Sequence, residues 1–518
     1  MSYVLGIDKG TTATKAVVIN AETGQALGTA RRQTPSYRPK PDWHEEDMEV
    51  TFDGVALAIR GAIEASGVDP AEIAAVGVSG HMGGLWALDS AGKPVGRAIA
   101  WPDARAASML EGWNEDGRTK RLYEICGNAP IPGLPLVLLS YIRQHEPERY
   151  ARIATVFCAK DYINYRLTGE IAMDESDLSF FPCDIRGRKV SPELLELAGV
   201  PKIRGRLPRI LGIGNIVGRV MREAAAQTGL AEGTPVVTGA GDAVAAAIGV
   251  GALEAGQAVT VIGTSFMNNL TVDRPMMEPE NVGFLFLMPE GRWQRLMSNT
   301  GGGSLCLDWI ISAFCQAEPG SGNGNADAIF ERIEQDARAV PPLAHGLLIH
   351  PYFNTSGMSA PRHEPAARGS IFGLDMATQP MTMVRAVMEG VALSMVECYA
   401  ALDAPVNEIR ITGGGARSKL WREICAAAMN RELMVPEVEE TGALGVAMLG
   451  ATAVGVHDSL TSAAERMVRI AEQVTPDPGL AERYQAAYPL FRDLGRDLTP
   501  LWKHRAALLQ AQEQQDSR

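Results

Sequence analysis

The chain has 518 residues, which is too long for one compact core and predicts at least two domains. Its composition, with 46% hydrophobic and 21% charged residues, is that of an ordinary globular protein. The net charge of −13 argues against non-specific binding to nucleic acid, which needs a cationic surface.

The seven cysteines are scattered and form no CxxC pair, so we expect free, buried thiols in a reducing cytosol. The first ten residues, MSYVLGIDKG, enter a strand-like run without a basic leader region or a cleavage site. The longest uncharged apolar run, 243–253, is too short to span a bilayer. We therefore expect a cytoplasmic protein with neither a membrane nor a nucleic-acid partner.

The first half of the chain predicts alternating strands and helices. Three short strands, at 3–7, 15–19 and 25–30, are joined by GTTAT and AETG turns. A helix at 49–65 and a strand at 73–79 follow, and then a segment with aromatic and apolar spacing at 147–167. A strand at 235–238 leads into a helix of small residues at 243–253.

The second half has the same alternation of predicted strands and helices. Strands at 258–262 and 268–272 flank a Gly-Thr-Ser turn, and a helix at 381–401, a strand at 408–412 and a helix at 419–429 follow. Helical spacing of aromatic residues after Pro478 predicts a terminal helix, and the polar residues beyond Lys503 predict a frayed end. The alternation indicates α/β layers, and the repeated strand–turn–strand unit suggests an internal duplication. We place the lobes at 1–243 and 244–518, with the site in the cleft between them.

Three motifs can carry chemistry, and the first begins at Asp8. This carboxylate ends a predicted strand, and the turn Gly10-Thr11-Thr12 follows it, with Lys15 beyond. Backbone N–H groups and hydroxyls of such a turn can bind phosphate oxygens, and the carboxylate can hold hydrated Mg²⁺. The alternative is an ordinary β-turn with a satisfied aspartate, because short Gly-Thr turns are common.

The second motif is Gly239-Ala240-Gly241-Asp242-Ala243, at the junction of a predicted strand and helix. Asp242 is a candidate general base at the junction of the lobes. It is equally a candidate N-cap of the following helix, and the residues alone leave both roles open.

The third motif, Gly413-Gly414-Gly415-Ala416-Arg417-Ser418, joins a predicted strand to a helix. Consecutive glycines let a flat ligand or a phosphate approach the backbone at a helix N-terminus. The alternative is a flexible connection that Ser418 caps. Gly263-Thr264-Ser265 and the glycines 301–303 are weaker signals of the same kind.

The order and spacing of DxGTTxxK, GxGD, GTS and GGGA resemble the FGGY carbohydrate kinase family over nearly the whole chain. Other stretches are also similar to family motifs. PDWHEED at 41–47 is similar to Pro-Gly-Trp-Val-Glu-Gln-Asp, and Trp101, Asp103 and Arg105 match Trp-x-Asp-x-Arg. Lys160-Asp161-Tyr162 with Leu167-Thr168-Gly169 matches Lys-Asp-Tyr and Leu-Thr-Gly.

The resemblance implies a duplicated, actin-like (ribonuclease H-like) α/β fold of two lobes and an ATP-dependent sugar kinase that uses Mg²⁺. It implies that Asp242 is the catalytic base and that Asp8 and Asp242 hold the metal. For ATP it implies contacts with Thr11, Thr12, Lys15, Gly263, Thr264, Gly302, Gly414, Gly415, Ala416 and Ser418. For the sugar it implies contacts with His81, Met82, Trp101, Asp103 and Asp242. Dimerisation is common in the family, so a homodimer stands as an open alternative to a monomer.

The sequence departs from the family pattern where the substrate is expected. Ser79-Gly80-His81-Met82-Gly83-Gly84 stands where xylulokinases carry Ser-Gly-Gln-Met-His-Gly. His81 is therefore either a substrate contact or a structural histidine at a strand end. Ala243 follows the expected base where relatives often carry a polar residue, and residues 351–361 replace the common Pro-Tyr-x-x-Gly-Glu-Arg-x-Pro.

We expect a pentulose such as xylulose as substrate, with a polyol such as erythritol or ribitol as the second choice. Two alternatives lie outside the kinases: an actin-like ATPase that drives a protein partner, and a sugar-binding regulator. The matches at 101–105 and 160–162 belong to the sugar-binding lobe and argue against the ATPase. The intact Asp8 and Asp242 argue against the regulator.

Overall fold

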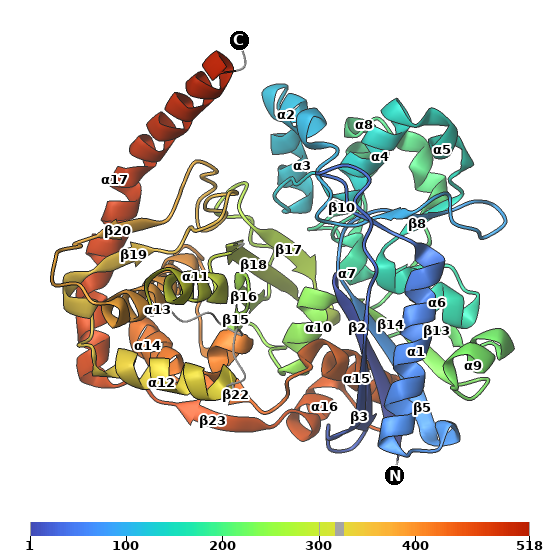
Figure 1. The fold of residues 1–518 in the computed structure, drawn as a ribbon. Coiled ribbons are helices and arrows are strands. Elements are labelled where there is room, and N and C mark those ends of the chain that lie inside the picture. Colours follow the sequence, from blue (N-terminus) through green and yellow to red (C-terminus); the bar gives the residue numbers. More distant parts are fainter. Residues whose placement is uncertain (1, 300, 316–325, 517–518) are drawn as a thin grey trace.

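Two β-sheets carry the two halves of the chain in the computed structural model, which describes residues 2–299, 301–315 and 326–516 (Figure 1). The first sheet has the spatial order β13-β14-β5-β1-β2-β3. The second has the order β17-β18-β16-β15-β21-β22-β23. The strands of the first sheet are β1 (Tyr3–Lys9), β2 (Ala13–Asn20), β3 (Ala26–Gln33), β5 (Ile73–Gly80), β13 (Ile216–Arg219) and β14 (Pro235–Gly241). Those of the second are β15 (Gln257–Ile262), β16 (Phe266–Val272), β17 (Phe284–Leu287), β18 (Trp293–Asn299), β21 (Glu408–Thr412), β22 (Leu433–Pro436) and β23 (Ile470–Val474).

The two sheets share a core of five strands with the same topology, which confirms the duplicated fold. The order β3-β2-β1-β5-β14 corresponds to β18-β16-β15-β21-β22. The strands outside this core differ, because β13 precedes its partner β14 in the chain whereas β23 follows its partner β22, and β17 is an additional edge strand. In each sheet a hairpin opens the unit, the first strand pairs in parallel with the fourth, and the last pair is antiparallel. Carboxyl ends of neighbouring parallel strands meet at one edge of a sheet, so each half presents such an edge.

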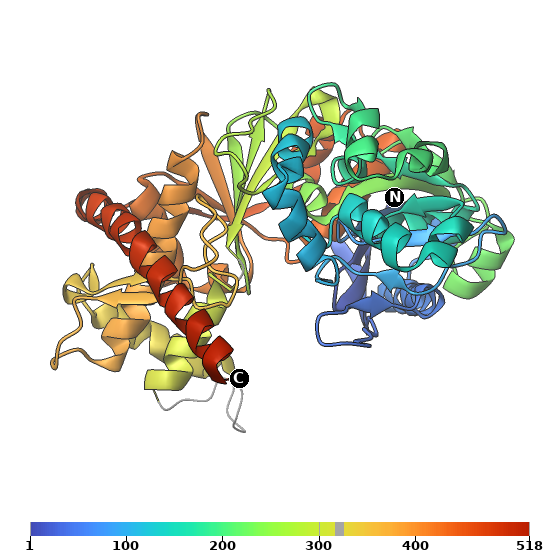
Figure 2. The ribbon, with the colours of Figure 1, turned by 90° about the horizontal axis from the view of Figure 1, so that it is seen from above.

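Helices cover these sheets. On the first, α1 (Met48–Ser66) and α6 (Ala159–Thr168) contact each other and the strands of one face, while α15 (Thr441–Ala453) packs on β1 and β5. The second sheet is accompanied by α11 (Ser304–Phe314), α12 (Ala326–Ala339), α13 (Pro380–Ala400), α14 (Lys419–Met429) and α17 (Pro478–Asp516). Further helices are α2 (Ala107–Glu115), α3 (Arg118–Cys126), α4 (Pro135–His145), α5 (Pro147–Arg152), α7 (Glu175–Leu178), α8 (Pro192–Leu197), α9 (Arg222–Thr228) and α16 (Leu460–Met467). Figure 1 shows α2, α3, α4, α5 and α8 at one end of the first lobe, and Figure 2 views the molecule from that end.

Short strand pairs complete the fold. They are β4 (Glu45–Glu46) with β7 (Ala98–Ile99), β6 (Trp86–Leu88) with β8 (Thr155–Phe157), β9 (Ala172–Asp174) with β12 (Arg209–Leu211), β10 (Cys183–Asp184) with β11 (Lys189–Val190), and β19 (Leu348–His350) with β20 (Ser370–Phe372).

Two helices cross at the junction of the lobes. Helix α10 (Asp242–Gly249), which follows β14, packs closely on α15, which follows the equivalent β22. Glycines make this approach possible: a Cβ on Gly249 would lie 1.8 Å from the Thr441 carbonyl oxygen, and one on Gly445 would lie 2.0 Å from that of Ala245. A segment from the second half of the sequence thus packs on the first sheet, so the simple division at residue 243 stays a prediction.

Most predicted elements are present with small changes of length, and the strand at Glu408–Thr412 and the helix at Lys419–Met429 have the predicted bounds. One prediction was wrong, because α17 continues to Asp516 instead of fraying after Lys503. The segment 147–167, for which no single element was predicted, contains α5, β8 and α6. The predicted helix at 243–253 is also shorter, because α10 ends at Gly249.

None of the seven cysteines, all of which the structure describes, forms a disulfide. Among the described residues, no helix combines the length and the apolar character needed to cross a membrane.

Candidate active site

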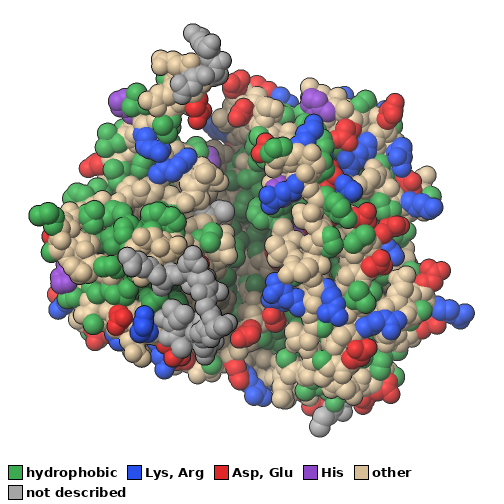
Figure 3. Space-filling model, in the orientation of Figure 1, with side chains coloured by type: hydrophobic (Ala, Val, Ile, Leu, Met, Phe, Trp, Pro, Cys, Tyr) green, Lys and Arg blue, Asp and Glu red, His purple; other side chains and the backbone are tan. Residues whose placement is uncertain are grey.

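A cleft of about 1050 Å³ opens between the lobes (Figure 3). From the first lobe it is lined by residues at the carboxyl ends of β1, β5 and β14. From the second lobe it is lined by the turn Gly263-Thr264-Ser265 and by β17 and β18. The corresponding strand ends of both halves therefore face one space, which the duplicated topology brings about.

Two carboxylates lie in this cleft. Asp8 is near the end of β1, and Asp242 is the first residue of α10, directly after β14. Helix α10 has no side-chain N-cap: Gly241 occupies the cap position, and Oδ1 of Asp242 accepts a hydrogen bond from the Ala243 N–H at 2.8 Å. The structure thus leaves Asp242 exposed to the cleft instead of using it as the predicted cap.

The surroundings favour the protonated form of both groups. Enclosure at the base of the cleft, and then the charge of Asp8, raise the pKa of Asp242 to about 7. Water in the open cleft screens part of this effect. Burial likewise raises the pKa of Asp8, while the neighbouring Ser79 hydroxyl and the charge of Lys15 act in the opposite direction. A carboxylate with a pKa near neutrality suits a general base.

The residues fit a hard cation such as Mg²⁺. Oδ1 of Asp8 is buried and has no hydrogen-bond partner among the described residues. Glycine at position 442 keeps the space beside this carboxylate open, since a Cβ there would lie 3.1 Å from Cγ of Asp8. Carboxylate oxygens without protein partners are the ligands that Mg²⁺ takes together with water and phosphate oxygens.

The two predicted phosphate turns face each other across the cleft, since Thr11, Gly263 and Thr264 all line it. Trp101 donates a hydrogen bond from Nε1 to the Thr11 hydroxyl at 2.9 Å, which ties the predicted sugar side to the phosphate side. Thr12 is exposed beside Thr11 but does not line the cleft.

Lys15 lies outside the lining of the cleft. Its Nζ is 2.7 Å from the Glu440 carboxylate, and this ion pair links β2 to the residue before α15. The pair is partly exposed, and the contact of Lys15 with phosphate stays a prediction.

The predicted adenosine loop is at the margin of this cleft. Thr412 lines it, whereas Gly414, Gly415 and Ala416 lie in the 3₁₀ turn Gly414–Arg417 and do not. Gly414 is exposed with open space around it. Ser418 is fully buried and caps α14 by accepting the Trp421 N–H at 3.1 Å, which is the structural alternative considered above. Gly302 is buried next to Asn299, away from the cleft lining.

The sugar side has an apolar wall that the sequence did not reveal. Phe180 of the first lobe packs against Phe284 and Phe286 on β17, with ring centroids 5.2 and 5.4 Å apart, and all three line the cleft. Met82 and Trp101 line it as predicted, and Asn114 on α2 adds an exposed polar group. No local motif marks the phenylalanines, because they come from distant segments.

The altered substrate motif lies against Phe180. Gly83 has a φ of 77°, which side chains rarely adopt, and a Cβ at this position would lie 3.1 Å from the Phe180 ring. The histidine that xylulokinases carry here would therefore need a strained backbone and a small shift of Phe180, whereas glycine leaves the Phe180 ring as the pocket surface at this point.

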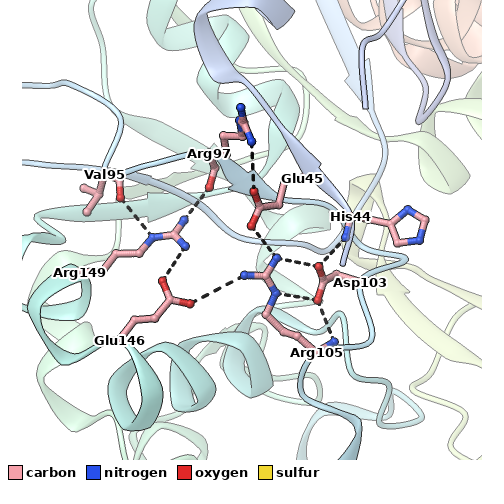
Figure 4. A network of polar contacts seen from close by, with 8 residues as sticks. All are labelled: His44, Glu45, Val95, Arg97, Asp103, Arg105, Glu146 and Arg149. Atoms are coloured by element: carbon pink, nitrogen blue, oxygen red, sulfur yellow. Dashed lines mark hydrogen bonds and ion pairs between the residues drawn. The ribbon is translucent and has the colours of Figure 1, made fainter. Parts of the chain in front are cut away.

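Asp103 does not line the cleft, although a substrate contact was predicted for it. It belongs instead to a network of polar contacts within the first lobe (Figure 4). It is 1% exposed, and its two carboxylate oxygens accept hydrogen bonds from the Arg105 guanidinium at 2.9 Å and from the His44 N–H at 2.7 Å. Arg105 also bonds Glu45 at 2.8 Å and lies over the Trp43 ring. Two stretches that carry the family resemblance thus form one buried network, and a substrate contact by Asp103 would require that network to open.

Lys160 has a similar buried role beneath Asp242. Its Nζ lies among the carboxylates of Asp161, Asp174 and Asp177, all without exposed side-chain surface. Ser176, which bonds Asp174, accepts the Gly241 N–H at 2.8 Å and so fixes the residue before Asp242. Cys158, Asp161 and Asp177 are close enough together to hold a cation, but the Lys160 ammonium already supplies that charge.

Comparison with known proteins agrees with this geometry. Models of the N-terminal and C-terminal domains of the FGGY family of carbohydrate kinases match residues 3–249 and 258–454. The chain is 30% identical to the xylulose kinase of Escherichia coli (strain K12), over 96% of this chain and 99% of that one. It is also 30% identical to the gluconokinase of Bacillus subtilis (strain 168), over 96% of each chain.

Among solved structures, xylulose kinase from Rhodospirillum rubrum superposes with a TM-score of 0.86 and 27% identity, covering 97% of this chain and 100% of that one. The two family models span both lobes and include Asp8 and Asp242. The chain belongs to the FGGY family of carbohydrate kinases.

Proposed function

We propose that this carbohydrate kinase phosphorylates a neutral open-chain ketose, with a pentulose such as xylulose as first candidate. A four- or five-carbon polyol such as erythritol or ribitol is the second. The observation that carries the proposal is the charge of the cleft. Asp8, Asp242 and the exposed Glu111 line it, and no lysine or arginine does so among the described residues.

This charge bears on gluconate, which carries a carboxylate. A bound carboxylate needs a positive partner or several N–H donors, because its desolvation is otherwise costly. The only basic side chains among the described lining residues are His81 and His363, and burial lowers the pKa of His81. The likeness to a gluconokinase therefore does not make gluconate the favoured substrate.

In the proposed reaction, the substrate hydroxyl donates a hydrogen bond to the Asp242 carboxylate. As the oxygen attacks the γ-phosphate of ATP, Asp242 takes the proton, and the O–P bond to ADP breaks. The backbone amides and hydroxyls around Thr11 and Thr264 face the space where the phosphates would lie. Closure of the lobes would exclude water, which otherwise competes as the acceptor.

We further propose that Asp8, together with Asp242, holds Mg²⁺, for which the unpaired Oδ1 of Asp8 provides a ligand. The ion would supply charge neutralisation for the phosphate oxygens. Thr12, Lys15, Gly302, Gly414, Gly415 and Ala416 remain predicted ATP contacts, whereas the side chain of Ser418 is taken up by the cap of α14.

The test is ADP release by the purified protein with Mg-ATP and a panel of xylulose, ribulose, erythritol, ribitol, glycerol and gluconate, with Asp242→Asn as control. We expect one neutral ketose or polyol to have much the highest kcat/KM, and the variant to be inactive. A preference for gluconate would contradict the charge argument. ADP release that no sugar stimulates would contradict the proposed substrate class.

A further inference from the structure

Three buried polar side chains lie directly beneath the strand ends that carry the reacting carboxylates. Lys9 Nζ is 2.9 Å from Oε2 of Glu46, and His81 Nε2 is 3.3 Å from Oε1 of the same carboxylate. Lys9, Glu46 and His81 are each no more than 1% exposed. We call them the Lys9–Glu46–His81 triad, and the mechanism above assigns no chemistry to it.

The triad joins the ends of two neighbouring strands. Lys9 ends β1 and pairs with Gly80 at the end of β5, and the His81 N–H donates to the Lys9 carbonyl at 3.0 Å. From these two ends both side chains converge on Glu46. Glu46 lies on β4, directly before the Asp47 that caps α1, so its position is fixed by the fold.

Each strand end continues into the reacting groups. Asp8 precedes Lys9, so the Lys9 side chain helps to fix the peptide that carries this carboxylate. Met82 follows His81 and lines the cleft with Asp242, and its backbone N–H acts to lower the pKa of Asp242. A shift of either strand end would thus change the distance between Asp8 and Asp242.

The protonation states agree with a structural role. Burial raises the pKa of Glu46, but the neighbouring His81 and the Lys9 charge act in the opposite direction, and the pKa is lowered overall. Burial, and then the Lys9 charge, lower the pKa of His81. Glu46 is therefore ionised and His81 is neutral, and both ring nitrogens of His81 are buried without a hydrogen-bond partner among the described residues. Removal of one partner from a buried ion pair leaves an uncompensated charge, so Lys9 and Glu46 hold each other in place.

We propose that Lys9, Glu46 and His81 are positioning residues that hold the ends of β1 and β5, and thereby set the geometry of Asp8 and Asp242 for phosphoryl transfer. This inference rests on the proposed function. It gives His81 a role that does not require contact with the substrate.

The test uses kcat, KM for both substrates, and the ratio of sugar-stimulated to unstimulated ADP release. Glu46→Gln and Lys9→Met should each lower kcat about tenfold or more, because small misplacements of reacting groups are costly. The ratio of sugar-stimulated to unstimulated ADP release should fall together with kcat. The double variant Lys9→Met/Glu46→Gln should exceed Lys9→Met alone in kcat, because no unpaired carboxylate is left behind.

Glu389→Gln is the matched control. Glu389 lies 2.8 Å from Arg385 in a pair whose side chains are each 4% exposed, on α13 and outside the cleft lining. Glu389→Gln should reduce the urea midpoint as much as Glu46→Gln does. It should leave the kcat of the folded protein within about twofold of the wild-type value.

A second pair of variants addresses His81 without creating a charge. His81→Gln keeps a polar N–H group beside Glu46 and should retain most of kcat, whereas His81→Leu should lower kcat about tenfold with little change in the KM for sugar. Wild-type kcat in folded Glu46→Gln and His81→Leu would overturn the inference, as would a change in sugar KM alone. Absence of sugar-stimulated ADP release by the wild-type protein would instead refute the proposed function.

Discussion

The raised pKa of Asp242 predicts the pH dependence of turnover. A general base must be ionised to accept the substrate proton, so kcat/KM should fall as pH drops through the pKa of the free enzyme. With a pKa of about 7, the ionised fraction decreases about tenfold between pH 8 and pH 6. We therefore expect a single acidic limb near pH 7 and about a tenfold loss of kcat/KM across this interval.

As pH rises, the contribution of Asp242 to stability should fall while activity rises. Asp242 has a higher pKa in the folded chain than the value near 3.9 of an unfolded one, so the folded state binds this proton more tightly. The stabilisation is complete below the unfolded pKa and is lost as pH rises through the folded pKa. At pH 8 the Asp242→Asn variant should thus be at least as stable as the wild type, while its kcat falls about a hundredfold or more.

The assay is steady-state ADP release from pH 5.5 to 9 with the best sugar, alongside thermal unfolding of both proteins at pH 8. Asp242→Glu is the matched control, because it keeps an ionisable group and should retain an acidic limb. A flat profile in the wild-type protein would refute the assignment of Asp242 as the titrating base. So would an Asp242→Asn variant with full activity.

Other predictions test the scaffold and the predicted contacts. Lys160→Met leaves three buried carboxylates without their cation and should cost about 3–5 kcal/mol of unfolding free energy, measured by urea denaturation; an unchanged midpoint would contradict it. Ser418→Ala should lower stability by about 1 kcal/mol through loss of the cap and leave the KM for ATP unchanged, so a raised KM would instead support the predicted ATP contact. His350 is 1% exposed against Phe491 of α17, and burial lowers its pKa to about 4 from 6.5, so stability is complete above pH 6.5 and should fall by about 3 kcal/mol as pH drops to 4. His350→Gln should remove that part of the pH dependence of unfolding.

The sequence by itself determined the local elements and the motif positions. Strand β21 and helix α14 have the predicted bounds because each has a strong apolar period and clear end signals, such as Ser418 before α14. Two strand–turn–strand units pointed to a duplication, and the two sheets confirm it with matching strand orders. The order of the motifs was sufficient to predict the kinase family, since each motif is local in the chain.

Tertiary structure decided which of those residues share the cleft. Phe284 comes from the second half of the chain to line the sugar side with Phe180, and α15 returns to pack on the first sheet. Asp103 and Ser418 have polar side chains in promising motifs, yet their partners lie within the fold. Such outcomes depend on contacts between segments distant in sequence, and neither periodicity nor propensity contains that information.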